Sequence, residues 1–357
     1  MRRILFIFSI LLSFIFNLSY GSDTKKIIDD LGLEVEVPNN PQRIVIADLP
    51  PLVHAYYVVN SGIEGLVGAP QNNALTDTIL PIVYPEVKNL STGFRSGGEL
   101  NIEALLALEP DLIFYRSDNQ QTGEIIRSAG VPAVAFQTFN AHGGNTVAAV
   151  ASWLKTLGEI LNKQETTHRL IANAYENMGI VQSKMWNIAE EDKVRMIYFN
   201  GLSTDENGLK VSGSGLFGKF WAEIAKANDV ASQDIKGVKP ISIEQLYKYN
   251  PEVIFLTFSK SKPENLYNNP LLADIDAIKN KRVYTAPMGM FSWYGPSTDV
   301  ALSFLWHAKM LYPKQFSDID IIAQTKKHYK EYYGYELLDA DIEFLFSDSL
   351  EILRTND

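Results

Sequence analysis

Two arginines follow predicted β-strands in the first half of the chain and could bind an anionic ligand. Arg95 lies in a Gly-rich loop, and Arg116 directly follows a buried apolar run. Open α/β sheets place ligands at the carboxyl ends of their strands, so both side chains would face one cleft. A guanidinium is always charged, and its forked donors match carboxylate, catecholate or oxyanion oxygens. The alternative is a solvated arginine, or an ion pair with Asp118 or Glu99.

The segment 286–296 could hold the organic part of such a ligand. It combines Met, Phe, Trp and Tyr with Gly and Pro directly after a predicted strand. A loop does not normally expose so much apolar surface. Trp293 and Tyr294 could therefore form a flat wall against a chelate, and a Tyr oxygen can also ligate a ferric ion. Local packing of Trp293 is the alternative.

Further polar candidates lie near other strand ends. Tyr198 lies near the end of a predicted strand, and Ser212 lies in the Gly/Ser-rich segment 211–217 that opens a predicted helix. Free backbone N–H groups at a helix start can receive an anion, but a serine there can equally cap the helix. His54, in the loop after the first strand, and His142 could be axial donors to nickel or haem.

The residue pattern argues against an enzyme. The chain has no cysteine, no Gly-x-Ser-x-Gly elbow and no Walker-type phosphate loop. Its histidines are isolated and show no paired metal-ligand spacing. We therefore expect a binding protein without a catalytic residue, cofactor or resident metal.

The N-terminus predicts export. Arg2 and Arg3 precede a nearly continuous apolar run from Ile4 to Leu18, and small residues precede a possible cleavage site before Ser22. This order is typical of a secretory signal peptide at residues 1–21. The run is shorter than the ~20 residues of a spanning helix. Because no cysteine is available for lipid modification, the predicted location is the periplasm, without a lipid anchor.

Composition and size predict an ordinary globular protein with two domains. The remaining chain of about 336 residues exceeds the ~250–300 at which single cores usually divide. The formal charge is −10, and loss of Arg2 and Arg3 makes it −12. Such a surface disfavours nucleic acid. We expect a monomer.

An internal repeat is the most informative feature of the sequence. The unit Asn101–Phe114 recurs as Ser242–Phe255, with Ile, Glu, Leu, Pro, Ile and Phe at equivalent places. In each copy Asn or Ser caps a short helix, Pro follows it, and a buried strand comes next. Two copies of one unit predict two α/β lobes of similar construction.

The remaining pattern alternates strands with helices, which favours parallel sheets with crossover helices. Asn145 to Leu161 has apolar residues at helical spacing and could join the lobes as a stiff strut. The predicted fold is α/β, with two lobes containing central parallel sheets and joined by a single long backbone helix. The predicted divisions are a first lobe at 22–143, the connecting helix at 144–163 and a second lobe at 164–357.

Taken together, these segments resemble the helical-backbone class of periplasmic binding proteins. The resemblance rests on Pro41–Val45, the two repeat units, the helix Trp153–Gly158 and the late segment 293–313. It covers about Lys25 to Tyr335. It implies a ligand cleft between two lobes that move little, and delivery of the ligand to a permease in the inner membrane.

The resemblance also implies two docking residues. Family members dock on the permease through one acidic residue on each lobe, and the repeat places these at Glu103 and Glu244. The alternative is local, because a carboxylate in the first helical turn is favourable against the helix dipole by ~0.3–1 kcal/mol.

The resemblance leaves several ligands open. Arg95, Arg116, Trp293 and Tyr294 favour a ferric siderophore or a similar iron chelate. A molybdate or tungstate receptor would instead use a small closed site, for which Ser212 and Tyr198 would serve. Nickel or haem, cobalamin, and a partner peptide are further alternatives.

Overall fold

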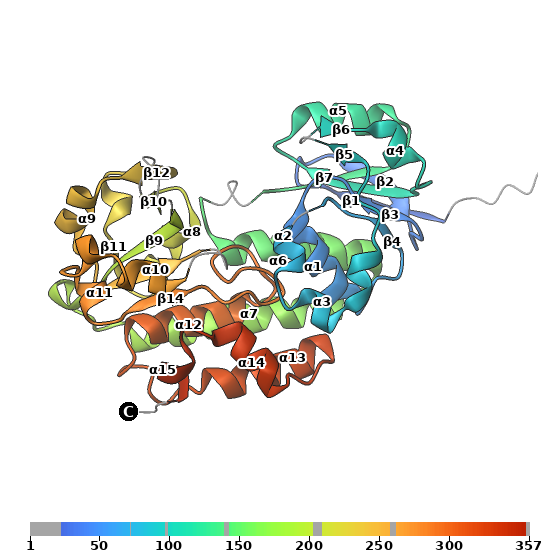
Figure 1. Ribbon diagram of the computed structural model, residues 1–357. Helices are drawn as coiled ribbons and strands as arrows, with labels where there is room; N and C mark the ends of the chain where they lie inside the picture. The colour runs from blue at the N-terminus through green and yellow to red at the C-terminus, as the bar shows by residue number, and fades with distance from the viewer. Residues whose placement is uncertain are drawn as a thin grey trace, which may run out of the picture.

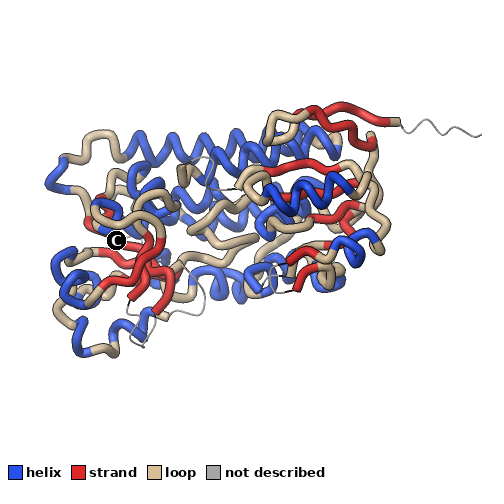
Figure 2. Tube along the Cα trace, turned by 90° about the horizontal axis from the view of Figure 1, so that it is seen from above, coloured by secondary structure: helices blue, strands red, loops and turns tan. Residues whose placement is uncertain are grey.

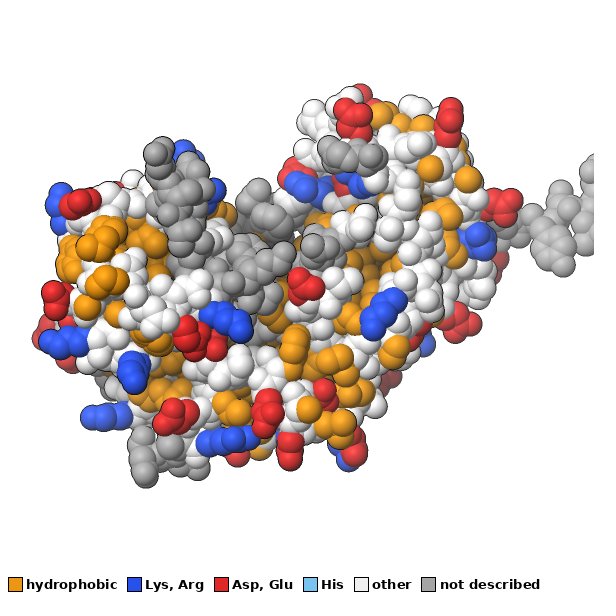
Figure 3. Space-filling model, in the orientation of Figure 1, with side chains coloured by type: hydrophobic (Ala, Val, Ile, Leu, Met, Phe, Trp, Pro, Cys, Tyr) orange, Lys and Arg blue, Asp and Glu red, His pale blue; other side chains and the backbone are white. Residues whose placement is uncertain are grey.

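The computed structural model describes residues 23–71, 73–96, 99–138, 143–202, 209–257 and 262–354, and it has two lobes (Figure 1). The space-filling view shows a hollow between them (Figure 3). The predicted signal peptide at 1–21 and His142 lie outside the described residues. Among the described helices, none combines the length and the apolar character that crossing a membrane requires.

The first lobe is built on a parallel sheet with strand order β4-β3-β7-β8. Its strands are short and apolar because helices cover them, as parallel sheets require. The sheet strands are β3 Ile44–Ile46, β4 Leu66–Gly68, β7 Leu112–Arg116 and β8 Ala133–Phe136. Two antiparallel pairs accompany them, β1 Thr24–Ile28 with β2 Glu34–Pro38, and β5 Arg95–Ser96 with β6 Glu99–Leu100.

The second lobe has a larger mixed sheet. The strand order is β12-β10-β9-β13-β14, with β11 beside β9. Strands β9, β11, β13 and β14 are parallel, whereas β10 and β12 add an antiparallel edge. The strands are β9 Arg195–Leu202, β10 Leu209–Ser212, β11 Asn228–Asp229, β12 Val238–Ile241, β13 Val253–Leu256 and β14 Val283–Thr285. The predicted two-lobed α/β fold with parallel sheets is confirmed.

Each repeat unit folds as the sequence predicts. Asn101 caps α4 (Ile102–Leu106) through Ala104 N–H, and Ser242 caps α9 (Ile243–Tyr249) through Gln245 N–H. The buried strands β7 and β13 then follow Pro110 and Pro251. Local capping and chain-breaking residues therefore direct the same unit in both lobes.

Long helices run along the length of the molecule from one lobe to the other (Figure 2). Helix α6, Thr146–Leu161, lies within the predicted connecting segment, and α7, Gln164–Lys184, runs back along it. Lys25 Nζ donates to the Glu159 and Ile160 carbonyls near the end of α6. Helix α12, Val300–Leu311, packs against α7 and is buried along its whole length. Figure 1 shows α7 and α12 below the lobes. The exact lobe divisions stay a prediction.

Shorter elements complete the described chain. The other α-helices are α1 Pro50–Asn60, α2 Asn73–Thr76, α3 Leu80–Val83, α5 Gln120–Ser128, α8 Phe217–Ile224, α10 Pro263–Tyr267, α11 Asp276–Lys279, α13 Ile321–Tyr333, α14 Asp339–Phe346 and α15 Leu350–Arg354. The 3₁₀ turns are η1 Pro85–Asn89, η3 Glu190–Asp192, η4 Ala231–Gln233 and η5 Pro270–Leu272.

Candidate functional site

Both predicted arginines line one cavity of about 350 Å³ on the first lobe. The cavity lies at the carboxyl edge of the sheet, because Asp48 follows β3 and Arg116 ends β7. Figure 3 shows basic side chains on the face of this lobe that borders the hollow. The cavity is lined by Asp48, Pro50, Pro70, Gln71, Arg95, Arg116 and Asn119. The structure therefore brings Arg95 and Arg116 together, as their positions after strands predict.

Arg95 is held by the end of β3. Its Nε donates to the Ala47 carbonyl at 2.8 Å, and its guanidinium lies 3.6 Å from the Asp48 carboxylate. It also reaches Thr122 Oγ1 at 3.5 Å. Its side chain is only 16% exposed, so its direction toward the cavity is largely fixed before ligand arrives.

Arg116 is paired with Asp118, one of the alternatives that the sequence leaves open. Arg116 Nε and a terminal nitrogen donate to the two Asp118 oxygens at 3.0 and 2.9 Å. The hydrogen bond from Arg116 lowers the pKa of Asp118, and Asp118 in turn raises the pKa of Arg116. Because this pair is more than a third exposed, a ligand anion can compete with Asp118 for the guanidinium.

Asp48 is a site residue that the sequence prediction missed. Its buried carboxylate accepts hydrogen bonds from the backbone N–H of Arg116 at 2.7 Å and from Asn119 Nδ2 at 3.1 Å. Burial raises the pKa of Asp48, although the hydrogen bonds and the arginines oppose that shift. The signal available in the sequence was its place directly after the first strand, where Asp48 begins the loop. The cavity thus offers both positive and negative groups.

The polar candidates of the second lobe are closed off. Tyr294 O–H donates to Ser212 Oγ at 2.8 Å, and Ser212 and Tyr198 are fully buried. Neither suggested role for Ser212 describes its position, because it ends β10 and the N-cap of α8 is Leu216. Burial raises the pKa of Tyr294 well above its ordinary value and keeps the hydroxyl protonated. Among the described residues, Tyr198 and Ser212 therefore present no exposed surface to an oxyanion.

Trp293 is part of the core and does not form a wall of the cleft. Its Nε1 donates to Asp299 Oδ2 at 2.9 Å, and its side chain is fully buried. Asp299 also accepts Met290 N–H and the hydroxyls of Tyr329 and Tyr333. The ring of Trp293 also packs edge-on against Trp306 of α12 and Phe346 of α14, so the packing alternative describes Trp293.

His54 lies inside α1 and contacts the other lobe. Its Nε2 accepts Thr298 N–H at 3.2 Å, and its ring stacks on Phe291 with a centroid distance of 5.4 Å. Burial lowers the pKa of His54 to about 3, so the ring is neutral at physiological pH. This position does not offer His54 as an open axial ligand.

A second, larger cavity lies on the second lobe. It measures about 600 Å³ and borders the end of β14 and the C-terminal part of α14. Its lining combines apolar side chains, such as Met288 and Phe344, with the charged residues Lys262, Glu264 and Asp348. Within the described ranges, no cluster of three His, Asp or Glu side chains could hold a metal ion.

Glu103 and Glu244 occupy matching exposed positions. Each lies in the first turn of its repeat helix. Figure 1 places α4 and α9 in the upper parts of the two lobes, away from the long helices below. A hydrogen bond from Ser242 lowers the pKa of Glu244, so its carboxylate stays charged.

This architecture defines a two-lobed solute receptor. The pattern of the periplasmic binding protein family matches residues 69–288, and the chain belongs to that family. The family consists of solute-binding receptors that deliver ligands to ABC permeases.

The similar proteins bind different ligands. The chain is 26% identical to the molybdate-binding protein MolA of Haemophilus influenzae, over 89% of this chain and 93% of MolA. It is 24% identical to the Fe(3+)-citrate-binding protein YfmC of Bacillus subtilis, over 75% of this chain and 80% of YfmC.

Solved structures show the same fold. A periplasmic solute binding protein from Veillonella parvula superposes with a TM-score of 0.82 at 22% identity, covering 93% of this chain and 99% of that one. Molybdate-bound MolA superposes with a TM-score of 0.73 at 24% identity, covering 88% and 99%.

Proposed function

We propose that this receptor binds a ferric chelate in the hollow between its lobes, with the anionic oxygens of the chelate against Arg95 and Arg116. The observation that carries the proposal is the cavity of about 350 Å³ that both arginines line together with Asp48 and Asn119. A guanidinium pair holds anionic oxygens well. Export through a signal peptide at 1–21 and a periplasmic location are part of this proposal.

The balance of charge in the cavity favours a chelate over a bare oxyanion. Arg95 and Arg116 lie beside the carboxylates Asp48 and Asp118, so the four groups sum to zero when all are ionised. A small dianion would meet the carboxylates as well as the arginines. A chelate carries anionic oxygens and hydrogen-bond donors at different points of a larger surface, and can satisfy both kinds of group.

Molybdate is the second candidate, because the similarity to MolA spans almost the whole of both chains. The two candidates differ in where they would bind. A tetrahedral oxyanion needs a compact set of donors, and the sequence offers Tyr198 and Ser212 for that purpose. Both residues are buried, and Ser212 already accepts a hydrogen bond.

Calorimetric titration of the purified protein tests the ligand class. The probes are ferric citrate, a ferric trihydroxamate and sodium molybdate. The double substitution Arg95→Gln with Arg116→Gln is expected to weaken a ferric chelate at least about tenfold, since charge-assisted hydrogen bonds contribute about 1.5–3 kcal/mol each. The matched control is Arg169→Gln, whose exposed ion pair with Glu331 lies on the helices beneath the lobes.

Each result decides between the candidates. Binding of a ferric chelate that the double substitution weakens and Arg169→Gln does not supports the proposal. Binding of molybdate alone would replace it with the second candidate. Chelate binding that survives the double substitution would remove the arginines from the site.

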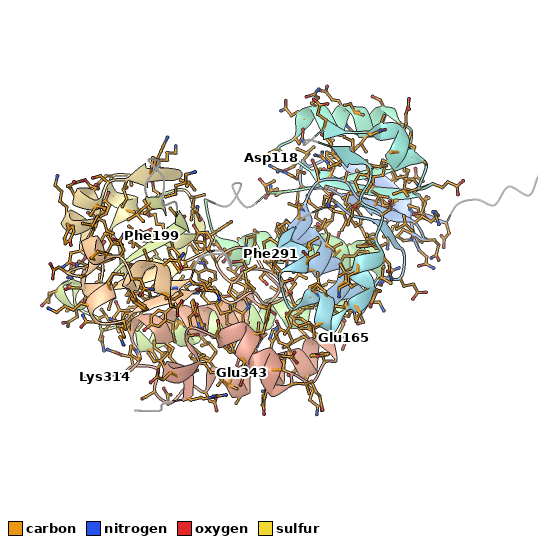
Figure 4. All side chains as sticks on the ribbon, viewed as in Figure 1. Asp118, Glu165, Phe199, Phe291, Lys314 and Glu343 are labelled. Carbon is orange, nitrogen blue, oxygen red and sulfur yellow. The ribbon has the colours of Figure 1, made fainter. Side chains whose placement is uncertain are left out.

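We further propose that Glu103 and Glu244 dock the receptor on its permease. Replacing both with Gln should abolish uptake of the ligand in cells and leave its affinity unchanged. The matched control replaces Glu165 and Glu343, which are exposed on the opposite, lower side of the molecule (Figure 4). Full uptake by the Glu103/Glu244 variant would refute the docking role.

A further inference from the structure

Phe291 is the aromatic side chain of segment 286–296 that keeps open surface. Trp293 is fully buried and Tyr294 is 7% exposed, whereas Phe291 is only half-buried. Figure 4 shows Phe291 between the two lobes, with Asp118 of the first lobe above it and Phe199 of the second lobe to its left.

The backbone around Phe291 is fixed on both sides. Met290 N–H donates to Asp299 Oδ2 at 2.7 Å, and Ser292 Oγ donates to the Thr257 carbonyl at 3.3 Å. Trp293 N–H closes the turn onto the Pro287 carbonyl at 2.9 Å. The loop therefore presents the Phe291 ring in a defined place, which lowers the entropic cost of using it in binding.

His54 fixes the ring of Phe291 from the first lobe. The two rings stack at 5.4 Å with an interplanar angle of 14°. Thr298 N–H donates to His54 Nε2, which requires the proton of this neutral ring to sit on Nδ1. Contacts from both lobes thus hold the pair.

Helix α1 connects this pair to the arginine cavity. Pro50, in the first turn of α1, lines the cavity, and His54 lies four residues later on the same face of the helix. Four residues correspond to a rise of about 6 Å. Phe291 therefore lies next to the helix face that forms one wall of the cavity.

We propose that Phe291 is the aromatic floor of the ligand site and contacts the organic shell of a chelate whose anionic oxygens are held by Arg95 and Arg116. This inference rests on the proposed function and adds the specificity determinant for chelates with an apolar shell. His54 is a positioning residue, because it acts through the ring of Phe291.

The test compares two ferric chelates on the full receptor. Phe291→Ala should weaken a ferric trihydroxamate about tenfold, the order expected when one aromatic contact is lost to water. It should change the affinity for ferric citrate, which has little apolar surface, less than about twofold. The matched control is Phe344→Ala, because the Phe344 side chain is 45% exposed and lines the other cavity. This control should change the affinity for neither chelate.

Two substitutions test the positioning role. His54→Gln keeps a hydrogen-bond acceptor for Thr298 but removes the stacked ring, and should weaken the trihydroxamate severalfold. His54→Phe keeps a stacked ring, and should restore most of that loss. Equal weakening by both substitutions would overturn the role assigned to the ring.

The outcomes separate this inference from the function beneath it. If Arg95→Gln weakens both chelates and Phe291→Ala weakens neither, the inference fails while the receptor function stands. If Phe344→Ala weakens the trihydroxamate instead, the organic shell lies in the larger cavity and the inference fails. If the wild-type protein binds molybdate and no ferric chelate, both fail together.

Discussion

The two lobes anchor their repeat units in the same way. In the first lobe, Arg43 Nε donates to the Leu108 and Glu109 carbonyls just past α4. In the second lobe, Arg195 Nε donates to the Asn250 carbonyl that ends α9. Glu109 and Asn250 both take positive φ values, 48° and 36°. We call the repeat unit with these arginine-to-carbonyl contacts the scaffold of each lobe.

The carboxyl edges of the two sheets differ. The first lobe leaves Arg95, Arg116 and Asp48 around an open cavity. In the second lobe, Tyr198 is buried, and so are Ser212 and its hydrogen-bond partner Tyr294 from the segment 286–296. The same scaffold can therefore carry one edge that borders an open cavity and one edge that is packed shut. Substitutions should reduce affinity at the open edge and stability at the closed edge.

The largest effect is expected at Asp299, in the closed edge. Asp299→Ala would leave the donors of Trp293, Met290 and at least one tyrosine without their acceptor. Buried unsatisfied donors cost about 1–3 kcal/mol each, so the free energy of unfolding should fall by about 4 kcal/mol. Chemical denaturation measures this change.

Asp118→Asn at the open edge is the matched control for Asp299. Asp118 belongs to a pair that is 38% and 39% exposed, so its loss should cost less than about 1 kcal/mol. Similar costs for the two substitutions would contradict the distinction between open and closed edges.

The second prediction concerns how the free energy of unfolding depends on pH. Asp229 in the second lobe and Asp118 in the first lobe should contribute to it with opposite signs. Burial raises the pKa of Asp229, in the second lobe, to about 6 from 3.8. The folded state then binds more protons than the unfolded state between about pH 4 and 6, so this group adds stability as the pH falls. The pKa of Asp118 is lowered, so its smaller contribution is lost on acidification.

Comparison of wild type with Asp229→Asn isolates that contribution. From pH 7 to pH 4, the wild-type protein should gain stability relative to the variant, by at most about 3 kcal/mol. Urea denaturation at a series of pH values measures it. Parallel pH profiles for the two proteins would show that Asp229 titrates normally.

A smaller effect should distinguish the two scaffold arginines. Arg43→Ala should cost about 1 kcal/mol, because it loses exposed hydrogen bonds to carbonyls. Arg195→Ala should cost about 2 kcal/mol, because Arg195 also pairs with Glu252 and Asp276. Thermal unfolding compares the two variants directly. A larger loss of stability for Arg43→Ala than for Arg195→Ala would contradict the added contribution of the ion pairs of Arg195.

The smallest effect is expected for Tyr294→Phe. The variant loses the buried hydrogen bond to Ser212, at a cost of about 1 kcal/mol. Because Tyr294 is sealed in the closed edge, ligand affinity should not change in calorimetric titration. A clear loss of affinity would return Tyr294 to the ligand site that the sequence predicts.

Several features of the site were accessible from the sequence because they are local. Arg116 ends the parallel strand β7, at the edge where ligands bind in such sheets, and its place in the cavity could be predicted. Arg95 lies in the short antiparallel strand β5, and its nearness to Arg116 comes from the fold. The pairing of Arg116 with Asp118 is also local. Asp48 could have been added by the same rule, since only Ala47 separates it from the end of strand β3.

The roles of the aromatic residues could not be assigned in this way. Trp293 and Phe291 are two residues apart in one apolar loop, yet one is buried against Asp299 and the other keeps open surface. The difference depends on α13, whose Tyr329 and Tyr333 complete the Asp299 cluster from 30 and 34 residues away. Composition cannot distinguish a loop that lines a cleft from one that packs under a helix.

Neighbouring residues and the period of apolar positions were enough to specify the repeated unit, its capped helices and its buried strands. Which sheet edge stays open depends instead on contacts between distant parts of the chain. The Tyr294–Ser212 bond joins residues 82 positions apart, and the His54–Thr298 bond joins residues 244 apart and crosses between the lobes. Burial of a polar group depends on such distant contacts, so packing decides which edge stays open.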